Sequence, residues 1–193
     1  MKQEDVIRFF DRRASTWDSN MFRSEAVIRA ILDNADVCEG ADILDVACGT
    51  GVLFPDYLAR GVRSMTAIDI SPEMVKIAQT KYPQIRVLCG DAETYVFPQK
   101  YDVIMIYNAF PHFPEPARVI YRLAQYIKLG GRFSIAHGMS RERLALHHAG
   151  QARSVSIELP DTEELAGMLV PWFDVKTVIS DDNMFQIVGT RFQ

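Results

Sequence analysis

The feature that most constrains the fold is a regular alternation of short apolar runs and helical segments between residues 41 and 137. The fourth apolar run is apolar almost throughout, which predicts a strand buried on both faces. Strands that alternate with helices predict a parallel sheet with helices on both faces, joined by right-handed crossovers. The five expected strands cover residues 43–47, 65–70, 85–88, 101–107 and 133–136. The expected helices between them cover residues 54–59, 72–81 and 115–128, the last ended by Gly130 and Gly131.

The two ends of the chain extend this pattern. Helices are expected at residues 4–14 and after Ser24, and again at 141–150 and 161–169. Two β-rich runs, 173–180 and 184–192, are separated only by a short polar turn, which predicts an antiparallel hairpin at the edge of the sheet. No repeat or linker divides the 193 residues. We therefore predict one α/β domain with a Rossmann-like doubly wound sheet, mostly parallel, with a C-terminal antiparallel hairpin.

The first strand ends in a glycine turn, and acidic residues accompany it. Gly49 and Gly51 permit a tight turn and let backbone N–H groups approach a ligand. Asp45 precedes the turn, and Asp69 follows Gly51 by 18 residues, at the end of the second strand. Ligands of open α/β sheets bind beyond the carboxyl ends of the strands, so both acids are expected at one site. Asp69 suits a ribose diol, and Asp45 suits a cationic group such as an ammonium.

A nicotinamide dinucleotide is the first ligand to compare with this pattern. Its fingerprint requires a third glycine three residues after the second, where the helix approaches the strand. Phe54 occupies that position, and the carboxylate of Asp45 would repel a pyrophosphate. An NAD-dependent oxidoreductase is therefore the less favoured alternative.

Composition narrows the class of partner. The 21 basic and 25 acidic residues give a net charge of −4, whereas nucleic-acid binders concentrate basic charge to displace counterions. The longest apolar runs, such as 103–106, are far too short to span a bilayer, and the N-terminus lacks the features of a secretory signal. Three cysteines without paired spacing are typical of reduced thiols. We expect a cytoplasmic protein with a small-molecule partner and neither a nucleic-acid nor a membrane partner.

Five segments, in order, resemble the motifs of class I S-adenosylmethionine-dependent methyltransferases. The segment after the first strand is similar to the family's first motif, and the other four follow the later strands. Residues 9–18 also resemble the N-terminal segment of the small-molecule branch that includes the quinone-biosynthesis methyltransferases. The resemblance covers about residues 8–137. The five motif segments are 45–51, 67–74, 90–93, 108–113 and 129–133.

The resemblance implies S-adenosylmethionine as the cofactor. In the family's arrangement the glycine turn lies along the methionine part, Asp45 lies near its ammonium and Asp69 holds the ribose hydroxyls. Asp91 would meet the adenine amino group, while Trp17 could close over the cofactor. The implied cofactor-binding set is Trp17, Asp45, Ala47, Gly49, Gly51, Asp69, Ile70, Met74, Asp91, Ala92 and Asn108.

The histidines are the candidates for acceptor chemistry. A neutral amine or hydroxyl acceptor must lose a proton, and histidine is suited to accept it near neutral pH. His112 follows the fourth strand and His137 ends the fifth, both at the ligand edge, so we predict these two as catalytic residues. His147 and His148 lie in the next helix and point about 100° apart. A metal centre that joins them to His137 is conceivable, but no ligand spacing supports it, and no metal site is predicted.

The resemblance thus implies an enzyme that transfers a methyl group from S-adenosylmethionine to a small-molecule acceptor. Residues 1–37 would form an N-terminal helical cap, 41–137 the cofactor-binding core, 138–172 an acceptor-side cover and 173–193 the C-terminal hairpin. A non-catalytic module that binds S-adenosylmethionine or S-adenosylhomocysteine is the alternative from a different class. The sequence leaves the acceptor, the methylated atom and the oligomeric state open.

Overall fold

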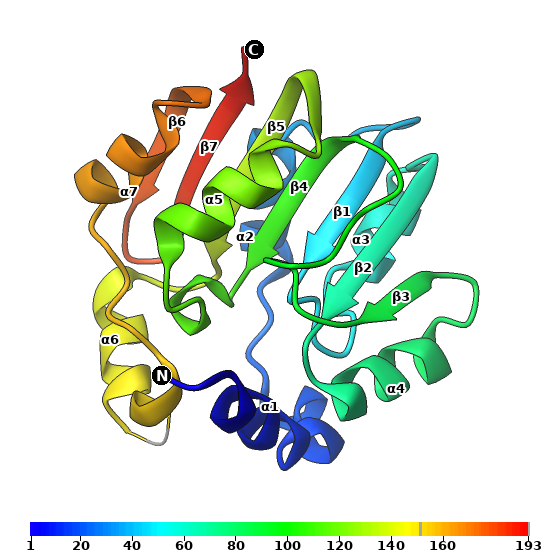
Figure 1. Cartoon of the computed structure of the whole chain (residues 1–193), viewed down its shortest axis with the longest axis vertical. Coiled ribbons are helices and arrows are strands. Elements are labelled where there is room, and N and C mark those ends of the chain that lie inside the picture. The colour runs from blue at the N-terminus through cyan, green and yellow to red at the C-terminus, as the bar shows by residue number, and fades with distance from the viewer. Residues whose placement is uncertain (151, 193) are drawn as a thin grey trace.

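A seven-stranded sheet in the order β3-β2-β1-β4-β5-β7-β6 organises the chain (Figure 1). The computed structural model describes residues 1–150 and 152–192, and for residues 20 and 147–149 only the backbone. Strands β1 to β5 pair in parallel, while β7 runs antiparallel to both β5 and β6. The predicted fold class, with its C-terminal antiparallel hairpin, is confirmed. The strands are β1 (Asp42–Val46), β2 (Ser64–Asp69), β3 (Arg86–Cys89), β4 (Tyr101–Tyr107), β5 (Ile127–His137), β6 (Phe173–Ser180) and β7 (Phe185–Arg191).

Helices cover both faces of this sheet, because successive strand side chains point to opposite sides. On β1, Ile43 packs in one apolar cluster with helices α2, α3 and α4, whereas Leu44 packs in another with α5 and α7. Helices α1 and α6 lie instead beyond the carboxyl ends of the parallel strands (Figure 1). The helices are α1 (Gln3–Asp11), α2 (Glu25–Asn34), α3 (Phe54–Ala59), α4 (Pro72–Lys81), α5 (Pro116–Ala124), α6 (Arg141–Ala149) and α7 (Thr162–Leu169). Short 3-10 turns lie at Ala14–Thr16, Asp18–Asn20, Phe110–His112 and Arg153–Val155.

Polar side chains cap the starts of α2, α4 and α7, and Ser140 caps α6 in the same way. The Ser24 side chain accepts a hydrogen bond from the backbone of Val27 at the start of α2. The Ser71 side chain accepts a backbone hydrogen bond in the same way at the start of α4, where a proline occupies the first turn. Asp161 forms a reciprocal capping box with Glu164 at α7. The starts of α2, α4 and α7 agree with the expected caps.

The predicted helix at 115–128 was too long. Helix α5 ends at Ala124, and Ile127 already pairs with Tyr101 as the first residue of β5. Gly130 and Gly131 therefore lie inside the strand, where the register with β4 shifts, and they do not end a helix. A Cβ at Gly131 would come within 2.8 Å of the Asp102 carbonyl oxygen, so this irregular pairing requires the glycine.

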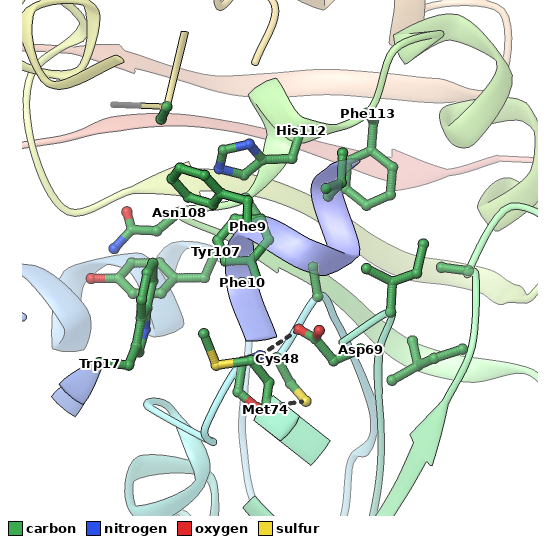
Figure 2. Close-up of a pocket in the computed structure, with 18 of the residues that line it drawn as sticks. Phe9, Phe10, Trp17, Cys48, Asp69, Met74, Tyr107, Asn108, His112 and Phe113 are labelled. Carbon is green, nitrogen blue, oxygen red and sulfur yellow. Dashed lines mark hydrogen bonds between the residues drawn. The ribbon is translucent and has the colours of Figure 1, made fainter. Parts of the chain in front are cut away.

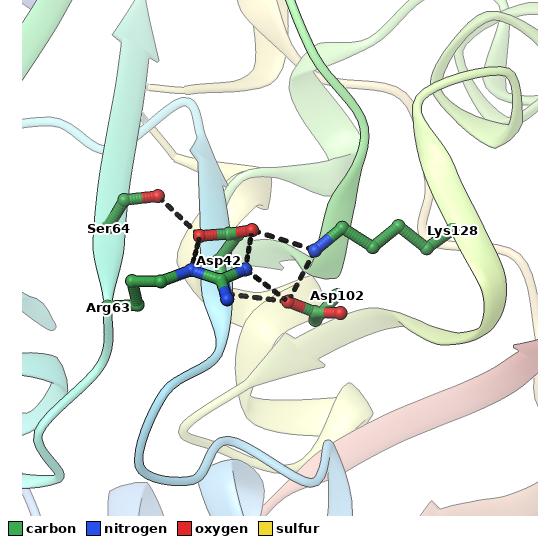
Figure 3. Close-up of polar contacts among 5 residues, drawn as sticks. All are labelled: Asp42, Arg63, Ser64, Asp102 and Lys128. Carbon is green, nitrogen blue, oxygen red and sulfur yellow. Dashed lines mark hydrogen bonds and ion pairs between the residues drawn. The ribbon is translucent and has the colours of Figure 1, made fainter.

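An ion network joins four strands at the amino end of the sheet (Figure 3). The carboxylate of Asp42 accepts hydrogen bonds from Arg63 and, at 2.7 Å, from the ammonium of Lys128. Lys128 also lies 2.8 Å from Asp102. The hydrogen bond from Arg63, with help from Lys128, holds the pKa of Asp42 well below its usual range. The network lies at the edge opposite the carboxyl ends of β1 to β5 and has a structural role.

Candidate functional site

One cavity of about 1280 Å³ lies beyond the carboxyl ends of β1 to β4. Sites for a single drug-sized ligand enclose roughly 300–1,000 Å³, so this cavity has room for a cofactor together with a second small molecule. Ten residues of the predicted cofactor set line it: Trp17, Asp45, Ala47, Gly49, Asp69, Ile70, Met74, Asp91, Ala92 and Asn108.

Asp69 ties the ends of β1 and β2 together. Its carboxylate accepts a hydrogen bond from the backbone N–H of Gly49 at 2.8 Å (Figure 2) and another from that of Ser71 at 2.9 Å. Burial nevertheless outweighs these bonds and raises the pKa of Asp69 to about 6. The group is thus a buried acceptor that borders the cavity and titrates close to neutral pH.

Asp45 is a buried acid without a hydrogen-bond partner for its side chain among the described residues. It is 2% exposed, and burial together with the nearby charge of Asp69 raises its pKa well above the usual value. A buried carboxylate of this kind is stabilised by a cation brought next to it. The cavity therefore offers a favourable position for a positively charged ligand group.

Two residues after adjacent strands take the left-handed backbone conformation that non-glycine residues rarely adopt. Ala47 follows β1 with φ 56°, and Asn108 follows β4 with φ 55°. The Asn108 side-chain oxygen accepts a hydrogen bond from the backbone N–H of Gly138 at 2.9 Å. This bond holds the carboxamide between the ends of β4 and β5.

Gly51 is the one member of the predicted cofactor set that does not line the cavity. Its φ is +86°, and a Cβ there would come within 2.6 Å of the Phe54 ring. The aromatic residue thus fills the space above the turn that a dinucleotide-binding fold leaves for close helix approach. Gly49 differs, since a Cβ there would meet only the Trp17 indole nitrogen, at 3.9 Å.

Aromatic side chains from the N-terminal segment cover the cavity (Figure 2). The Phe10 ring packs edge-on against Phe9 at 5.2 Å, Trp17 at 5.6 Å and His112 at 4.8 Å between centroids. Helix α1 thereby connects the glycine turn to the segment after β4.

Two acids that the sequence analysis missed fasten this N-terminal segment. Asp11 accepts a hydrogen bond from the Ser71 hydroxyl at 2.5 Å, next to Asp69. Asp18 accepts one from Thr50 in the glycine turn at 2.5 Å and lies 2.7 Å from the Lys81 ammonium. These three contacts join residues 32 or more apart in the sequence, and no local pattern signals them.

His112 is placed at the cavity, as expected of a catalytic candidate. Its Nδ1 lies 2.8 Å from the Val155 carbonyl oxygen and 3.2 Å from the Ser156 hydroxyl. Since a carbonyl can only accept, Nδ1 donates, and in the neutral ring the basic nitrogen is then Nε2. The backbone after α6 thus fixes the tautomer of this histidine.

His137 lies elsewhere. It is fully buried in β5, opposite Phe185 of β7 with 6.2 Å between ring centroids, and it is absent from the cavity lining. The side chains of His147 and His148 fall outside the described residues. Within the described part of the chain, no group of three or more metal-ligating side chains is close enough to hold a metal ion. No helix of that part is long and apolar enough to cross a bilayer.

Comparison with known proteins agrees with this geometry. Residues 43–131 match the family described as a methyltransferase domain. The malonyl-[acyl-carrier protein] O-methyltransferase of Acetivibrio thermocellus is 30% identical over 156 residues, 77% of this chain and 55% of that protein. The demethylmenaquinone methyltransferase of Paenarthrobacter aurescens is 29% identical over 141 residues, 70% and 55%. The chain thus spans about half the length of the curated relatives it matches.

Solved structures share the fold over nearly the whole chain. A chain from the complex of the Haloferax volcanii Trm112 methyltransferase activator with a methyltransferase superposes with a TM-score of 0.83 at 20% identity, covering 97% of this chain and 98% of that one. The N-methyltransferase NodS from Bradyrhizobium japonicum, in complex with S-adenosylhomocysteine, superposes with a TM-score of 0.72 at 12% identity, covering 97% and 99%. Residues 43–131 therefore match a methyltransferase-domain family, as their motifs predicted, and the fold is shared with solved methyltransferases.

Proposed function

We propose that this chain is an S-adenosylmethionine-dependent methyltransferase that acts on a small-molecule acceptor. The observation that carries the proposal is the convergence of Asp45, Asp69 and Asp91, from the ends of β1, β2 and β3, on one cavity beside the Gly49 turn. In the proposed enzyme, residues 41–137 hold the cofactor, residues 1–37 cap it and residues 138–172 cover the acceptor side. The methyltransferase names of the relatives, quinone-directed in one case, support the acceptor class.

The residues present suit such a cofactor. The buried Asp45 carboxylate would face the ammonium, Asp69 would accept from the ribose hydroxyls, and Gly49 would offer open backbone. Ile70 and Met74 would flank the adenine. Asp91, Ala92, Ala47, Asn108 and Trp17 would complete the enclosure. When bound, the cofactor supplies a sulfonium that activates its methyl group toward a nucleophile.

His112 would serve the acceptor. With Nδ1 donating to the Val155 carbonyl, Nε2 can take the proton of a hydroxyl or amine acceptor as it becomes a nucleophile. Phe10 packs edge-on against this ring, with 4.8 Å between the ring centroids. His112→Asn keeps a donor near the Nδ1 position but removes the base, so turnover should fall by about 10²–10⁴-fold while S-adenosylhomocysteine affinity stays unchanged.

Tritium transfer from [methyl-³H]S-adenosylmethionine tests the proposal. The chain is incubated with the dialysable, nucleic-acid and protein fractions of a bacterial extract in separate reactions. Label in the dialysable fraction, lost in His112→Asn, is the expected result. Label only in protein or nucleic acid would refute the acceptor class. Tight binding of the cofactor without transfer to any fraction would identify a non-catalytic binding module instead.

A further inference from the structure

Among the described residues, the part of the cavity wall built after α5 carries a single charged side chain. Beyond residue 118 the lining consists of Met139, Arg143, Leu144 and Ala152. Val6 of α1 lines the cavity too and packs in one small apolar cluster with Ala152. In the described part of the chain, Val6, Met139, Leu144 and Ala152 thus give this wall an apolar surface beside the Arg143 guanidinium, while Gln3 of α1 also lines the cavity.

The acids of the cavity lie on other elements. Those at the ends of β1, β2 and β3 are the proposed partners of the ammonium, the ribose hydroxyls and the adenine, and the other two flank Arg118 of α5. The acidic lining residues are Asp45, Asp69, Asp91, Glu93 and Glu115. The described lining after α5 therefore differs from the strand ends, because it is mainly apolar and its one charged side chain is Arg143.

Arg143 differs from two of the other arginines of the lining, Arg13 and Arg118. Arg118 forms ion pairs with Glu93 at 3.3 Å and Glu115 at 3.4 Å, and the Arg13 guanidinium stacks 3.7 Å from the centre of the Phe9 ring. Among the described residues, Arg143 has no ion pair and no side-chain hydrogen bond. Arg143 thus places a positive charge at the cavity, and no acid of the described chain forms an ion pair with it.

Two nearby arginines, Arg141 and Arg12, have surroundings that differ from those of Arg143. Arg141, two residues earlier on α6, is held by the Leu159 carbonyl at 3.0 Å and lies 3.3 Å from Glu158, outside the cavity. Arg12 lines the cavity without an ion pair, but it follows Asp11, which bonds to Ser71 at the start of α4. Arg12 therefore lies at the C-terminal end of α1, beside the start of α4.

We propose that the acceptor is an amphipathic anion whose apolar body lies along this wall and whose carboxylate, sulfonate or phosphate group binds Arg143. The proposal rests on the proposed function, because it gives the acceptor the part of the cavity that the cofactor leaves. Arg143 is exposed and its charge is partly screened by water, so its effect on affinity is about five- to tenfold. It is a specificity residue that selects an anionic acceptor over a neutral one of the same shape.

Two fluorescent probes test this without knowledge of the natural acceptor. 8-Anilinonaphthalene-1-sulfonate and N-phenyl-1-naphthylamine share one aromatic body and differ by the sulfonate. Both are titrated into the protein with and without saturating S-adenosylhomocysteine. The variants are Arg143→Gln, Arg143→Lys and the matched control Arg153→Gln, which removes an exposed arginine of the neighbouring groove and outside this cavity.

The expected result is tighter binding of the sulfonate, weakened about five- to tenfold in Arg143→Gln and largely retained in Arg143→Lys and Arg153→Gln. The neutral probe should bind all four proteins alike. Equal affinity for both probes, equal effects of Arg143→Gln and Arg153→Gln, or no binding of either probe would overturn the proposal. A protein that binds the probes as expected but not S-adenosylhomocysteine would contradict the proposed function alone.

Discussion

Protonation of Asp69 should weaken cofactor binding at mildly acidic pH. The ribose hydroxyls of the proposed cofactor require a carboxylate acceptor, and the pKa of Asp69 is raised to about 6 by burial. Such a group is about one-tenth ionised near pH 5 and almost fully ionised near pH 7.5. The affinity for S-adenosylhomocysteine should therefore fall about tenfold between these values, or about 1.4 kcal/mol.

Folding stability should respond to this group in the opposite direction. A carboxyl group whose pKa is raised in the folded state contributes stability below its usual pKa, and this contribution is lost as pH rises through about 6. Weaker binding near pH 5 is therefore not the result of an Asp69-dependent loss of folded protein. This separation of the two trends makes the affinity measurement interpretable.

Calorimetric titration with S-adenosylhomocysteine across this pH range measures the effect. Repeating it in buffers of different ionisation enthalpy counts the protons released on binding. Wild type should release close to one proton per site near pH 5 from Asp69, and Asp69→Asn should bind weakly with a flatter pH dependence. An affinity that is the same at both pH values would refute the argument that ionised Asp69 is the ribose acceptor.

Three further predictions concern stability in urea denaturation. Gly51→Ala places a Cβ against Phe54 at positive φ and should cost about 2–4 kcal/mol; Gly40→Ala, at φ +78° with nothing within 4 Å, should cost only about 1–2 kcal/mol. Equal losses would exclude the ring overlap as the cause. The lowered pKa of Asp42 contributes stability that is lost as pH falls below about 4. Asp42→Asn should therefore lose about 1.5–3 kcal/mol near pH 7 and less on acidification than wild type; an unchanged acid response would contradict this. Asp161→Ala removes the capping box of α7 and should cost about 1 kcal/mol, whereas wild-type stability would show that the cap contributes nothing.

Local sequence patterns were sufficient to predict much of the sheet and the part of the site at the strand ends. The apolar runs located the strands, and the acids and glycines at their ends pointed to one cavity, because parallel strands end at the same edge. The error at 115–128 arose because the apolar spacing of α5 continues into Ile127, while pairing with Tyr101 determines where the strand begins. Helical periodicity does not include that long-range contact.

The remainder of the site depends on contacts between distant segments. Asp11 and Asp18 look like ordinary exposed acids until the N-terminal segment folds over Ser71 and Thr50. From the sequence, His112 and His137 were equally good catalytic candidates, because each lies at the carboxyl end of a strand. Pairing with β7 buried His137 against Phe185, whereas His112 reached the cavity on a turn fixed by Val155.

A crystal structure of the chain with S-adenosylhomocysteine is the most direct test of where the cofactor binds. The account predicts density in a single cavity, with the amino group beside Asp45, the ribose on Asp69 and the base between Met74 and Asp91. Density in another part of the molecule, or a ligand that leaves these three carboxylates in contact with water alone, would contradict it.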